Sequence, residues 1–425
     1  MAATTQAKPE QEKPKTSALI TLTSIPLIMV LGNSMLIPVL PTASSVLGVT
    51  SFQVSLLITL FSIPAAIVIP IAGILSDRIG RKKVIAISLL LYGLGGLLAG
   101  IASVWKGGSY GFLLAARIIQ GIGAAGTAPI AMVLVSDLYT KEQRSKALGI
   151  IEASNAMGKV LSPILGSLIA LITWYAMFFA FPLLCIPAAI ALWLLIKEPA
   201  AKQEPPPLSQ YKEHIKKIFA RQGKWLTVAF FAGAITMFTM FGVLFHLSDF
   251  LEKTYKIDGV IKGFILAIPL LALCLTAYFT GAHVKEKTNQ MKKLIMTGLI
   301  TSALAIGVVP WIDNAILLIT VSFFMGIGSG LILPCLNTLI TSAVGMQERG
   351  IITSLYGSVR FFGVALGPPV FGALANRPFL LFLGTGVLLA IAFVLAMIFI
   401  QRPQRLRGKD GRTRLLIRKR RLHPA

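Results

Sequence analysis

Long apolar runs, separated by short polar breaks, dominate the sequence. A helix needs about 20 mostly apolar residues to cross a bilayer. Charged residues make up only 13% of the chain, too few to cover a soluble globular protein. The chain is therefore predicted to be an all-α polytopic membrane protein with twelve transmembrane helices. We place them at 18–40, 51–76, 84–104, 110–137, 146–169, 173–196, 225–250, 259–283, 291–309, 313–342, 350–374 and 378–400.

Lys and Arg gather in alternate polar breaks. If the N-terminus is placed in the cytoplasm, the cytoplasmic segments hold 32 of the 40 Lys and Arg residues. Cytoplasmic loops of membrane proteins carry such an excess, so we predict a multi-pass protein of the cell (plasma or inner) membrane with both termini in the cytoplasm. The net charge of +24 then comes mainly from the Lys and Arg residues of the cytoplasmic segments, including a basic tail. For that tail we favour anionic membrane lipid over nucleic acid as the partner.

The chain is predicted to contain two copies of a six-helix unit. Glycine and proline have backbone roles that other residues fill badly, and a shift of 205 residues superposes several of them. The matched pairs are Gly121 and Gly326, Gly123 and Gly328, Pro129 and Pro334, Gly158 and Gly363, and Pro163 and Pro368. We predict a segment at 1–17, two six-helix bundles at 18–196 and 225–400 related by pseudo-twofold symmetry, a linker at 197–224 and a tail at 401–425.

The linker at 197–224 has two interpretations. Its stretch YKEHIKKIFAR, at 211–221, is basic and amphipathic, which is typical of a helix on a membrane surface. A plain solvated linker is the alternative. In both cases a connector between two similar bundles suits a carrier whose halves rock, because a channel needs no such hinge.

Four short stretches resemble motifs of the major facilitator superfamily. GILSDRIGRKKV, at 73–84, is similar to the family's loop between the second and third helices. LGNSMLIPVLP, at 31–41, ARIIQGIGAAG, at 116–126, and GKVLSPILG, at 158–166, resemble motifs of its drug:proton antiporter branch, with Ser162 where glycine is usual. The resemblance implies a twelve-helix transporter that works by alternating access.

The loop motif implies a conformational latch formed by Gly73, Asp77, Arg78, Gly80 and Arg81. In the family the matching Asp is held at the start of the eleventh helix in the outward-facing state, which would place Asp77 near Gly350. The cations alone could serve as a topological anchor, but that interpretation leaves the acid unexplained. The second-half counterpart has Lys285 in place of the acid, so the latch is expected to be asymmetric.

Ionisable residues inside transmembrane helices are costly and usually functional. Arg117 lies in the span at 110–137, and the resemblance assigns it to proton relay beside Gln120; snorkelling to the surface is the alternative. Glu152, Asn155 and Lys159 share one face of the span at 146–169. We predict that Glu152, Arg117 and Asp249 couple transport to protons. A structural Glu–Lys pair is the competing interpretation of Glu152, and a surface pair with His246 at the outer mouth is that of Asp249.

The predicted substrate cavity is nominally positive. Arg360 occupies the position in the second half that Asn155 occupies in the first, so the two are expected to face each other. An excess of cations favours an anionic or zwitterionic amphiphile over a lipophilic cation. Met237 and Phe241 could line an adaptable cavity or face lipid. The predicted cavity residues are Asn33, Arg117, Gln120, Glu152, Asn155, Lys159, Met237, Phe241 and Arg360.

Small residues and prolines recur at matching places in the spans at 146–169 and 350–374. They are Gly158, Ser162, Pro163 and Gly166 in the first half and Gly363, Gly367 and Pro368 in the second. Such residues let helices approach closely and bend. The resemblance implies a seal against leak in exporters, and helix packing is the alternative.

The function predicted is secondary active transport. The sequence has no nucleotide-binding loop, catalytic triad or metal-ligand spacing, so we predict no enzyme activity, no cofactor and no metal. The main hypothesis is a proton-coupled exporter (antiporter) of amphiphilic small molecules or drugs, acting as a monomer. The alternatives are an exporter of an anionic metabolite or siderophore, and a uniporter or lipid-headgroup flippase of the same fold. Uptake instead of export also stays open.

Overall fold

The structure, a computed structural model, describes residues 16–105, 109–139, 141–198, 207–286, 290–312, 314–343, 349–400, 403–407 and 413–417. Helices form nearly all of it. The α-helices of the first half are α1 (Thr16–Ser34), α2 (Leu40–Leu47), α3 (Ser51–Ile79), α4 (Arg81–Val104), α5 (Ser109–Ala125), α6 (Ala128–Leu138), α7 (Lys141–Ala170) and α8 (Ala176–Leu195). Those of the second are α9 (Leu208–Tyr255), α10 (Gly259–Glu286), α11 (Met291–Gly307), α12 (Ala315–Ala343), α13 (Arg349–Ala373) and α14 (Pro378–Phe399). Two short 3₁₀ helices, η1 (Ile37–Val39) and η3 (Val309–Trp311), join neighbouring helices.

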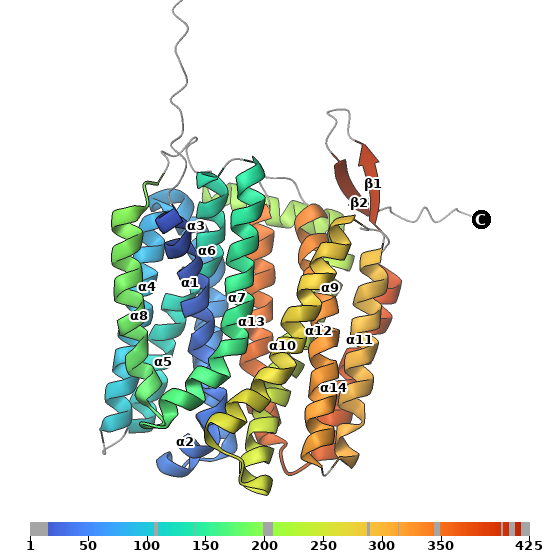
Figure 1. Cartoon of the computed structure of the whole chain (residues 1–425). Coiled ribbons are helices and arrows are strands. Elements are labelled where there is room, and N and C mark those ends of the chain that lie inside the picture. The colour runs from blue at the N-terminus through green and yellow to red at the C-terminus, as the bar shows by residue number, and fades with distance from the viewer. Residues whose placement is uncertain are drawn as a thin grey trace, which may run out of the picture.

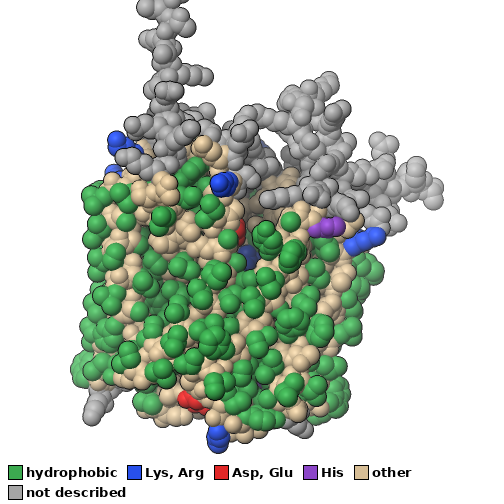
Figure 2. All heavy atoms as spheres, viewed as in Figure 1, with side chains coloured by type: hydrophobic (Ala, Val, Ile, Leu, Met, Phe, Trp, Pro, Cys, Tyr) green, Lys and Arg blue, Asp and Glu red, His purple; other side chains and the backbone are tan. Residues whose placement is uncertain are grey.

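Within the described residues, eleven helical spans are long and apolar enough to cross a membrane. They correspond to all the predicted spans except the one at 146–169. That span is part of α7, whose hydropathy is lowered by Glu152, Asn155 and Lys159. In Figure 1, α7 nevertheless runs beside the other long helices through the body of the molecule. An apolar side-chain surface covers the part of the molecule between the two polar faces in Figure 2. The chain is a multi-pass membrane protein.

The helices form two groups that lie side by side (Figure 1). One group contains α1 to α8 and the other α9 to α14, and the main contacts between them are α3 against α13 and α7 against α10. The predicted fold class, two six-helix bundles, is confirmed. We call the face that carries the start of α1 and the start of α9 the linker face, and the opposite one the far face.

Close glycine contacts repeat in the two halves, as a duplication requires. A Cβ on Gly121 in α5 would lie 2.1 Å from the carbonyl oxygen of Phe61 in α3, and a Cβ on Gly326 in α12 would lie 2.2 Å from that of Pro269 in α10. These helices are the fourth and second spans of their halves. The matched glycines therefore fix the same helix pair in each bundle, because only a residue without a side chain allows backbones to approach so closely.

Helix α9 joins the predicted linker to the seventh span without a break. Its first turns lie along the linker face in Figure 1, and the rest of the helix crosses the molecule. The rings of Phe219 and Phe230 lie 6.2 Å apart although eleven residues separate them. A straight helix rises about 1.5 Å per residue, so α9 bends between these residues. Tyr211 and Ile218 are buried, so this piece packs on protein.

The tail contains two short strands in addition to the predicted helices. Strand β1 (Pro403–Arg407) pairs with β2 (Thr413–Ile417) in an antiparallel hairpin, with Pro403 opposite Ile417. The hairpin lies beyond the linker face, outside the two bundles (Figure 1). The rest of the tail lies outside the described residues, as does most of the segment at 1–17.

The two halves meet at the far face, while at the linker face a hollow lies beside their contact along α3 and α13, where a Cβ on Gly73 would lie 3.3 Å from the Ser354 hydroxyl. Near the far face the Ser248 hydroxyl donates to the carbonyl of Ile37 at 2.9 Å, and deeper in, the Thr59 hydroxyl donates to that of Ala365 at 2.7 Å. Toward the linker face Glu152 is exposed although it lies in the middle of α7. Figure 2 shows a hollow here between the two groups of helices, with acidic and basic atoms in its depth. The hollow between the halves lies at the linker face, while the far face carries a surface pocket lined by both halves.

The glycine contacts predict opposite effects for two matched substitutions. Gly121→Ala places a methyl group against the Phe61 carbonyl and should lower stability by about 1–3 kcal/mol. Gly149→Ala adds its methyl group where no atom lies within 4 Å, so it should raise stability by up to about 1 kcal/mol through helix propensity. Thermal unfolding of the purified protein in detergent measures both. Equal effects at the two positions would contradict the close packing described.

Candidate transport site

Arg117 is completely buried inside the first bundle. Its Nε donates to the carbonyl of Leu57 at 2.8 Å, and one terminal nitrogen donates to the Gln120 side chain at 2.5 Å. The other terminal nitrogen donates to the Gly32 carbonyl at 3.2 Å and to the Asn33 side chain at 2.8 Å. The guanidinium therefore joins α1, α3 and α5 through hydrogen bonds to all three.

Neighbouring groups complete the environment of Arg117. Its guanidinium lies 4.5 Å from the centre of the Phe61 ring, close enough for a cation–π contact. The Asn33 amide also donates to the Ser62 hydroxyl at 2.8 Å. The structure thus brings together Asn33, Arg117 and Gln120, three of the predicted cavity residues, but it places them within the bundle. Their roles in substrate binding and proton relay stay predictions.

A second charged group lies between the two halves. Lys159 on α7 is within electrostatic range of Arg360 on α13 and of Glu152, two turns earlier on its own helix. Within the described part of the chain, no ion pair shorter than 4 Å involves any of these three side chains. Asn155 lies between Glu152 and Lys159 and is partly exposed. The interface therefore holds two cations against one carboxylate.

Two residues beside these cations were not predicted. The Arg360 guanidinium lies 5.5 Å from the centre of the Tyr356 ring, one helical turn away. The Cys274 thiol on α10 donates to the carbonyl of Ala156 on α7 at 3.1 Å, and its sulfur is within electrostatic range of Lys159. The spacing of Tyr356 and Arg360 is a signal that sequence reasoning could have used. Nothing in the sequence indicates that Cys274 meets α7.

Met237 and Phe241 lie on α9, in the second bundle. Met237 is only 5% exposed and packs in the core, while Phe241 is partly exposed. The neighbouring Phe238 ring lies 5.8 Å from that of Phe371 on α13. These side chains therefore form part of the contact between α9 and α13, and an adaptable cavity wall built from them stays a prediction.

The small residues of α7 and α13 sit at equivalent helix contacts. A Cβ on Gly166 would lie 2.2 Å from the carbonyl oxygen of Met35 in the first span, and one on Gly363 would lie 2.2 Å from that of Ala234 in the seventh. The remaining motif residues share these surfaces or lie within the same helices: Gly158, Ser162, Pro163, Gly367 and Pro368. The packing role is visible in these contacts, and the seal against leak stays a prediction.

The predicted latch residues lie at the linker face, where α3 ends and α4 begins. Gly80 has a φ of 100°, a conformation that favours glycine, and makes the tight turn between the helices. The Asp77 carboxylate pairs with Arg81 at 3.4 Å and accepts a hydrogen bond from the Tyr211 hydroxyl on α9 at 3.2 Å. Burial and the nearby Asp77 charge raise the pKa of Tyr211 above its ordinary value. Contact between Asp77 and the start of α13 stays a prediction for the outward-facing state.

Two further acids hold this turn. The Glu198 carboxylate accepts hydrogen bonds from the backbone N–H groups of Arg81 and Lys82, at 2.5 and 3.2 Å, and so caps the start of α4. Asp137, at the end of α6, forms an ion pair with the Arg81 guanidinium. Arg78 is exposed. The loop motif therefore contacts the ends of α6 and α8 and the linker part of α9. None of these three contacts could be predicted from the motif.

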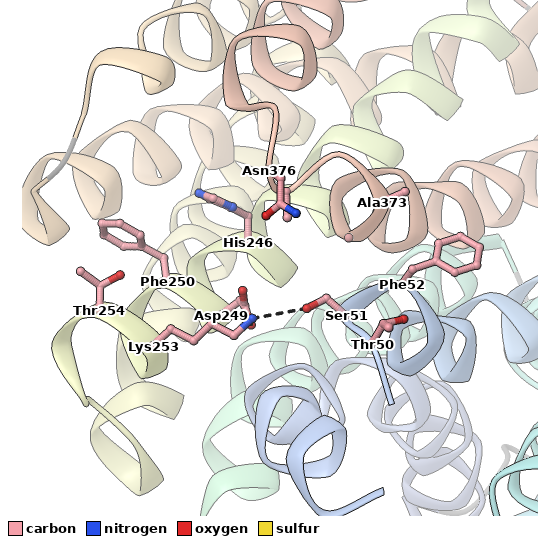
Figure 3. Close-up of a pocket in the computed structure, with 12 residues that line it drawn as sticks. Thr50, Ser51, Phe52, His246, Asp249, Phe250, Lys253, Thr254, Ala373 and Asn376 are labelled. Carbon is pink, nitrogen blue, oxygen red and sulfur yellow. Dashed lines mark hydrogen bonds and ion pairs between the residues drawn. The ribbon is translucent and has the colours of Figure 1, made fainter. Parts of the chain in front are cut away.

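Asp249 lies apart from the central cations, in a pocket at the far face. The pocket has a volume of about 580 Å³ and is lined by both halves. Asp249 pairs with Lys253 at 3.0 Å, and Lys253 also donates to the Ser51 hydroxyl at 3.4 Å (Figure 3). His246 lines the same pocket, and its ring lies 4.9 Å from that of Phe382.

Eleven apolar spans and the more polar α7, arranged in two similar bundles with cations at their interface, are the architecture of a membrane transporter in the described part of the chain. The profile of the Major Facilitator Superfamily matches residues 22–368 and 292–423. The chain belongs to this superfamily of membrane transporters, and it is not an enzyme.

Two bacterial relatives and one solved structure agree with this assignment. The bacillibactin exporter of Bacillus subtilis (strain 168) is 46% identical over 361 residues, which cover 84% of this chain and 90% of that protein. Multidrug resistance protein 1 of the same organism is 30% identical over 403 residues, 90% of this chain and 97% of the relative. A bacterial homologue of the human lysosomal transporter Spinster, in an inward-facing and unoccupied conformation, superposes with a TM-score of 0.70 at 17% identity and covers 93% of this chain and 98% of its own.

The contrast between the two arginines gives a stability prediction. Arg117→Met leaves the buried carbonyls of Leu57 and Gly32 without their donors, at a cost of about 1–3 kcal/mol for each unsatisfied group. Arg360→Met removes a side chain that holds no such bonds in the described structure and should change stability far less. Thermal unfolding in detergent compares them. If Arg360→Met proved the more damaging change, the assignment of Arg117 as the structural cation would be wrong.

The Asp77–Tyr211 hydrogen bond should stabilise the attachment of the linker part of α9 to the end of α3. Because the pKa of Tyr211 is raised, its hydroxyl stays protonated and keeps donating at neutral pH; the stability it contributes is lost only as the pH rises above about 10. Tyr211→Phe should remove about 1 kcal/mol and speed amide hydrogen exchange of residues 208–221 about fivefold at neutral pH. Tyr278→Phe, an exposed position, is the control. Unchanged exchange in Tyr211→Phe would show that the bond does not hold the linker.

Proposed function

We propose that the chain is a proton-coupled exporter that moves an anionic amphiphile out of the cell by alternating access. The linker face is then the cytoplasmic face, and the present structure is open to the cytoplasm. One observation supports this proposal above all others. Lys159 and Arg360 lie within electrostatic range of each other at the interface of the halves, and neither has a carboxylate within 4 Å in the described structure.

Unpaired cations at this depth are stabilised when an anion binds between them. A charge taken out of water costs several kcal/mol unless it is paired, and two like charges add their mutual repulsion. An acidic group on the substrate would relieve both costs when the halves close around it. A lipophilic cation would increase them. The charge balance therefore favours an acidic substrate over the cationic drugs that a general efflux pump exports.

The relatives indicate the direction and the first compound to test. A protein that is 46% identical over 90% of its length is named a bacillibactin exporter. Export by this chain, and bacillibactin or a similar metabolite as its substrate, follow as proposals from that similarity. The second relative is named for multidrug resistance, which keeps a broader range of amphiphiles within the proposal.

Glu152 is the proposed coupling residue at the cytoplasmic side. Its carboxylate is exposed to the hollow and lies within range of Lys159. In this proposal the acidic group of the substrate binds Lys159 and Arg360. Other groups of the substrate then donate charge-assisted hydrogen bonds to the Glu152 carboxylate while that carboxylate is ionised. Protonation removes that negative acceptor. Proton and substrate would thus exclude each other, which is what antiport requires. A coupling role for Asp249, which pairs with Lys253 in the far-face pocket, stays a prediction, and Arg117 supports the site through its bonds to α1 and α3.

Transport in proteoliposomes tests the proposal. A pH gradient should drive bacillibactin movement by the wild type, and Glu152→Gln should abolish the response to the gradient while leaving exchange down the substrate's own gradient. Lys159→Met and Arg360→Met should each raise KM by about 10-fold or more, since a hydrogen bond to a charged group contributes about 1.5–3 kcal/mol. Glu213→Gln, in an exposed pair with Lys217, is the control.

Three results would change parts of this proposal. Wild-type flux that ignores the gradient would replace the antiporter with a uniporter or a lipid-headgroup flippase. Full coupling in Glu152→Gln would show that another acidic residue carries the coupled proton. Unchanged KM in both cation variants would contradict the anionic substrate.

A further inference from the structure

A buried lysine with two carboxylates lies at the far face, away from the central cations. Lys262, in the first turn of α10, is fully buried. Its ammonium group forms ion pairs with Glu252, in the last turns of α9, and with Asp258, in the loop between the helices, at 2.7 Å to the latter. We call Glu252, Asp258 and Lys262 the far-face cluster. None of the three belongs to the site described above.

The far-face cluster reaches across to the other half. One oxygen of the Glu252 carboxylate accepts from the Thr42 hydroxyl on α2 at 3.4 Å, while the other oxygen holds Lys262. Thr42 belongs to the first bundle and Lys262 to the second. The Glu252 carboxylate therefore bridges the halves on the side where the protein is closed, and the bridge must break when this side opens.

A small cavity between the halves lies beside the cluster, and Asp258 is the cluster residue that lines it. It has a volume of about 160 Å³ and is lined by Thr42, Ser167 and Asp258, among others. The Ser167 side chain is buried, and its hydroxyl has no hydrogen-bond partner among the described residues. Each water molecule needs about 30 Å³ and two or more polar partners, so the cavity suits a short water chain. Asp258 is 56% exposed, which connects the cluster to the outside solution.

We propose that the far-face cluster is the site where the transporter takes up its proton from outside, with Glu252 as the acceptor. This rests on the proposed antiport. Two carboxylates and one ammonium carry a net charge of −1, so one proton makes the cluster neutral. The proton comes from external water and forms an O–H bond on Glu252. Lys262 keeps Asp258 as its partner, so no buried cation is left unpaired by the step.

The net charge gives the direction of coupling. Closing the far face takes Lys262 and most of the Glu252 side chain out of water, while Asp258 stays 56% exposed. A neutral cluster costs less to bury than one with a net charge. Protonation therefore favours the closed far face, which returns an emptied carrier to the cytoplasmic side, as antiport requires. Of the other ionisable groups at this face, Lys253 is paired with Asp249, His246 lines the far-face pocket, and Lys256 and Arg377 are exposed. Helix α2 and residues 160–174 contain no Asp, Glu, His, Lys or Arg.

Spin-label distances across the far face test the proposal without any substrate. Labels at Val46→Cys and Lys256→Cys, both exposed positions, would be attached in nanodiscs after Cys185, Cys274 and Cys335 are replaced by Ala. Between about pH 8 and about pH 5 the ratio of closed to open molecules should rise about threefold or more. Glu252→Gln makes the cluster neutral at every pH, so it should stay closed and lose this response. Glu213→Gln should keep it.

Asp258→Asn provides a second variant if Glu252→Gln does not fold. It leaves one carboxylate with Lys262, a neutral pair that needs no proton, and it should also lose the response. A wild-type ratio that does not change with pH would overturn the proposal, and so would a full response in either cluster variant. Failure of the proposed antiport would appear separately, as bacillibactin flux indifferent to a pH gradient.

Discussion

The membrane interior leaves a charged side chain two options: a partner within the protein or a place where a ligand supplies one. Arg117 in the first bundle has its partners within the protein. Its guanidinium bonds to backbone carbonyls of α1 and α3 and to side chains of α1 and α5, so the charge that costs most to bury also fixes three helices. We propose that a ligand supplies the partner of Lys159 and Arg360, at the interface where the halves separate and meet. The proposed transport of an anion depends on this difference between held and unheld cations.

Close glycine contacts hold the helices within each half and also join the halves at the far face. Inside the bundles, glycines such as Gly121 and Gly326 bring backbones into direct contact. Between the bundles, a Cβ on Gly263 would lie 2.7 Å from the carbonyl oxygen of Pro163, and one on Gly372 would lie 2.9 Å from that of Ser51. Hydrogen bonds such as Ser248 to Ile37 and Thr42 to Glu252 add to these contacts. Such bonds contribute about 1 kcal/mol each and can be exchanged for water when the halves move apart.

Much of the fold could be predicted because the bilayer imposes length and hydropathy on every span. The span at 146–169 was predicted with the others as an apolar run, although its charged residues lower its hydropathy. The partners of single side chains could not be predicted in this way. The Tyr211–Asp77 bond depends on a bend in α9, and the ion pairs of Lys262 depend on how α9 turns into α10. For Arg117 the neighbour Gln120 was expected, but neither its bond to Asn33 nor the position of the group inside the bundle was.

A density map of the protein with bound bacillibactin tests the central claim most directly. The account predicts an acidic group of the ligand between Lys159 and Arg360, within hydrogen-bond distance of both, with Arg117 still bonded inside its bundle. A ligand bound elsewhere, with Lys159 and Arg360 left without an anion, would contradict it.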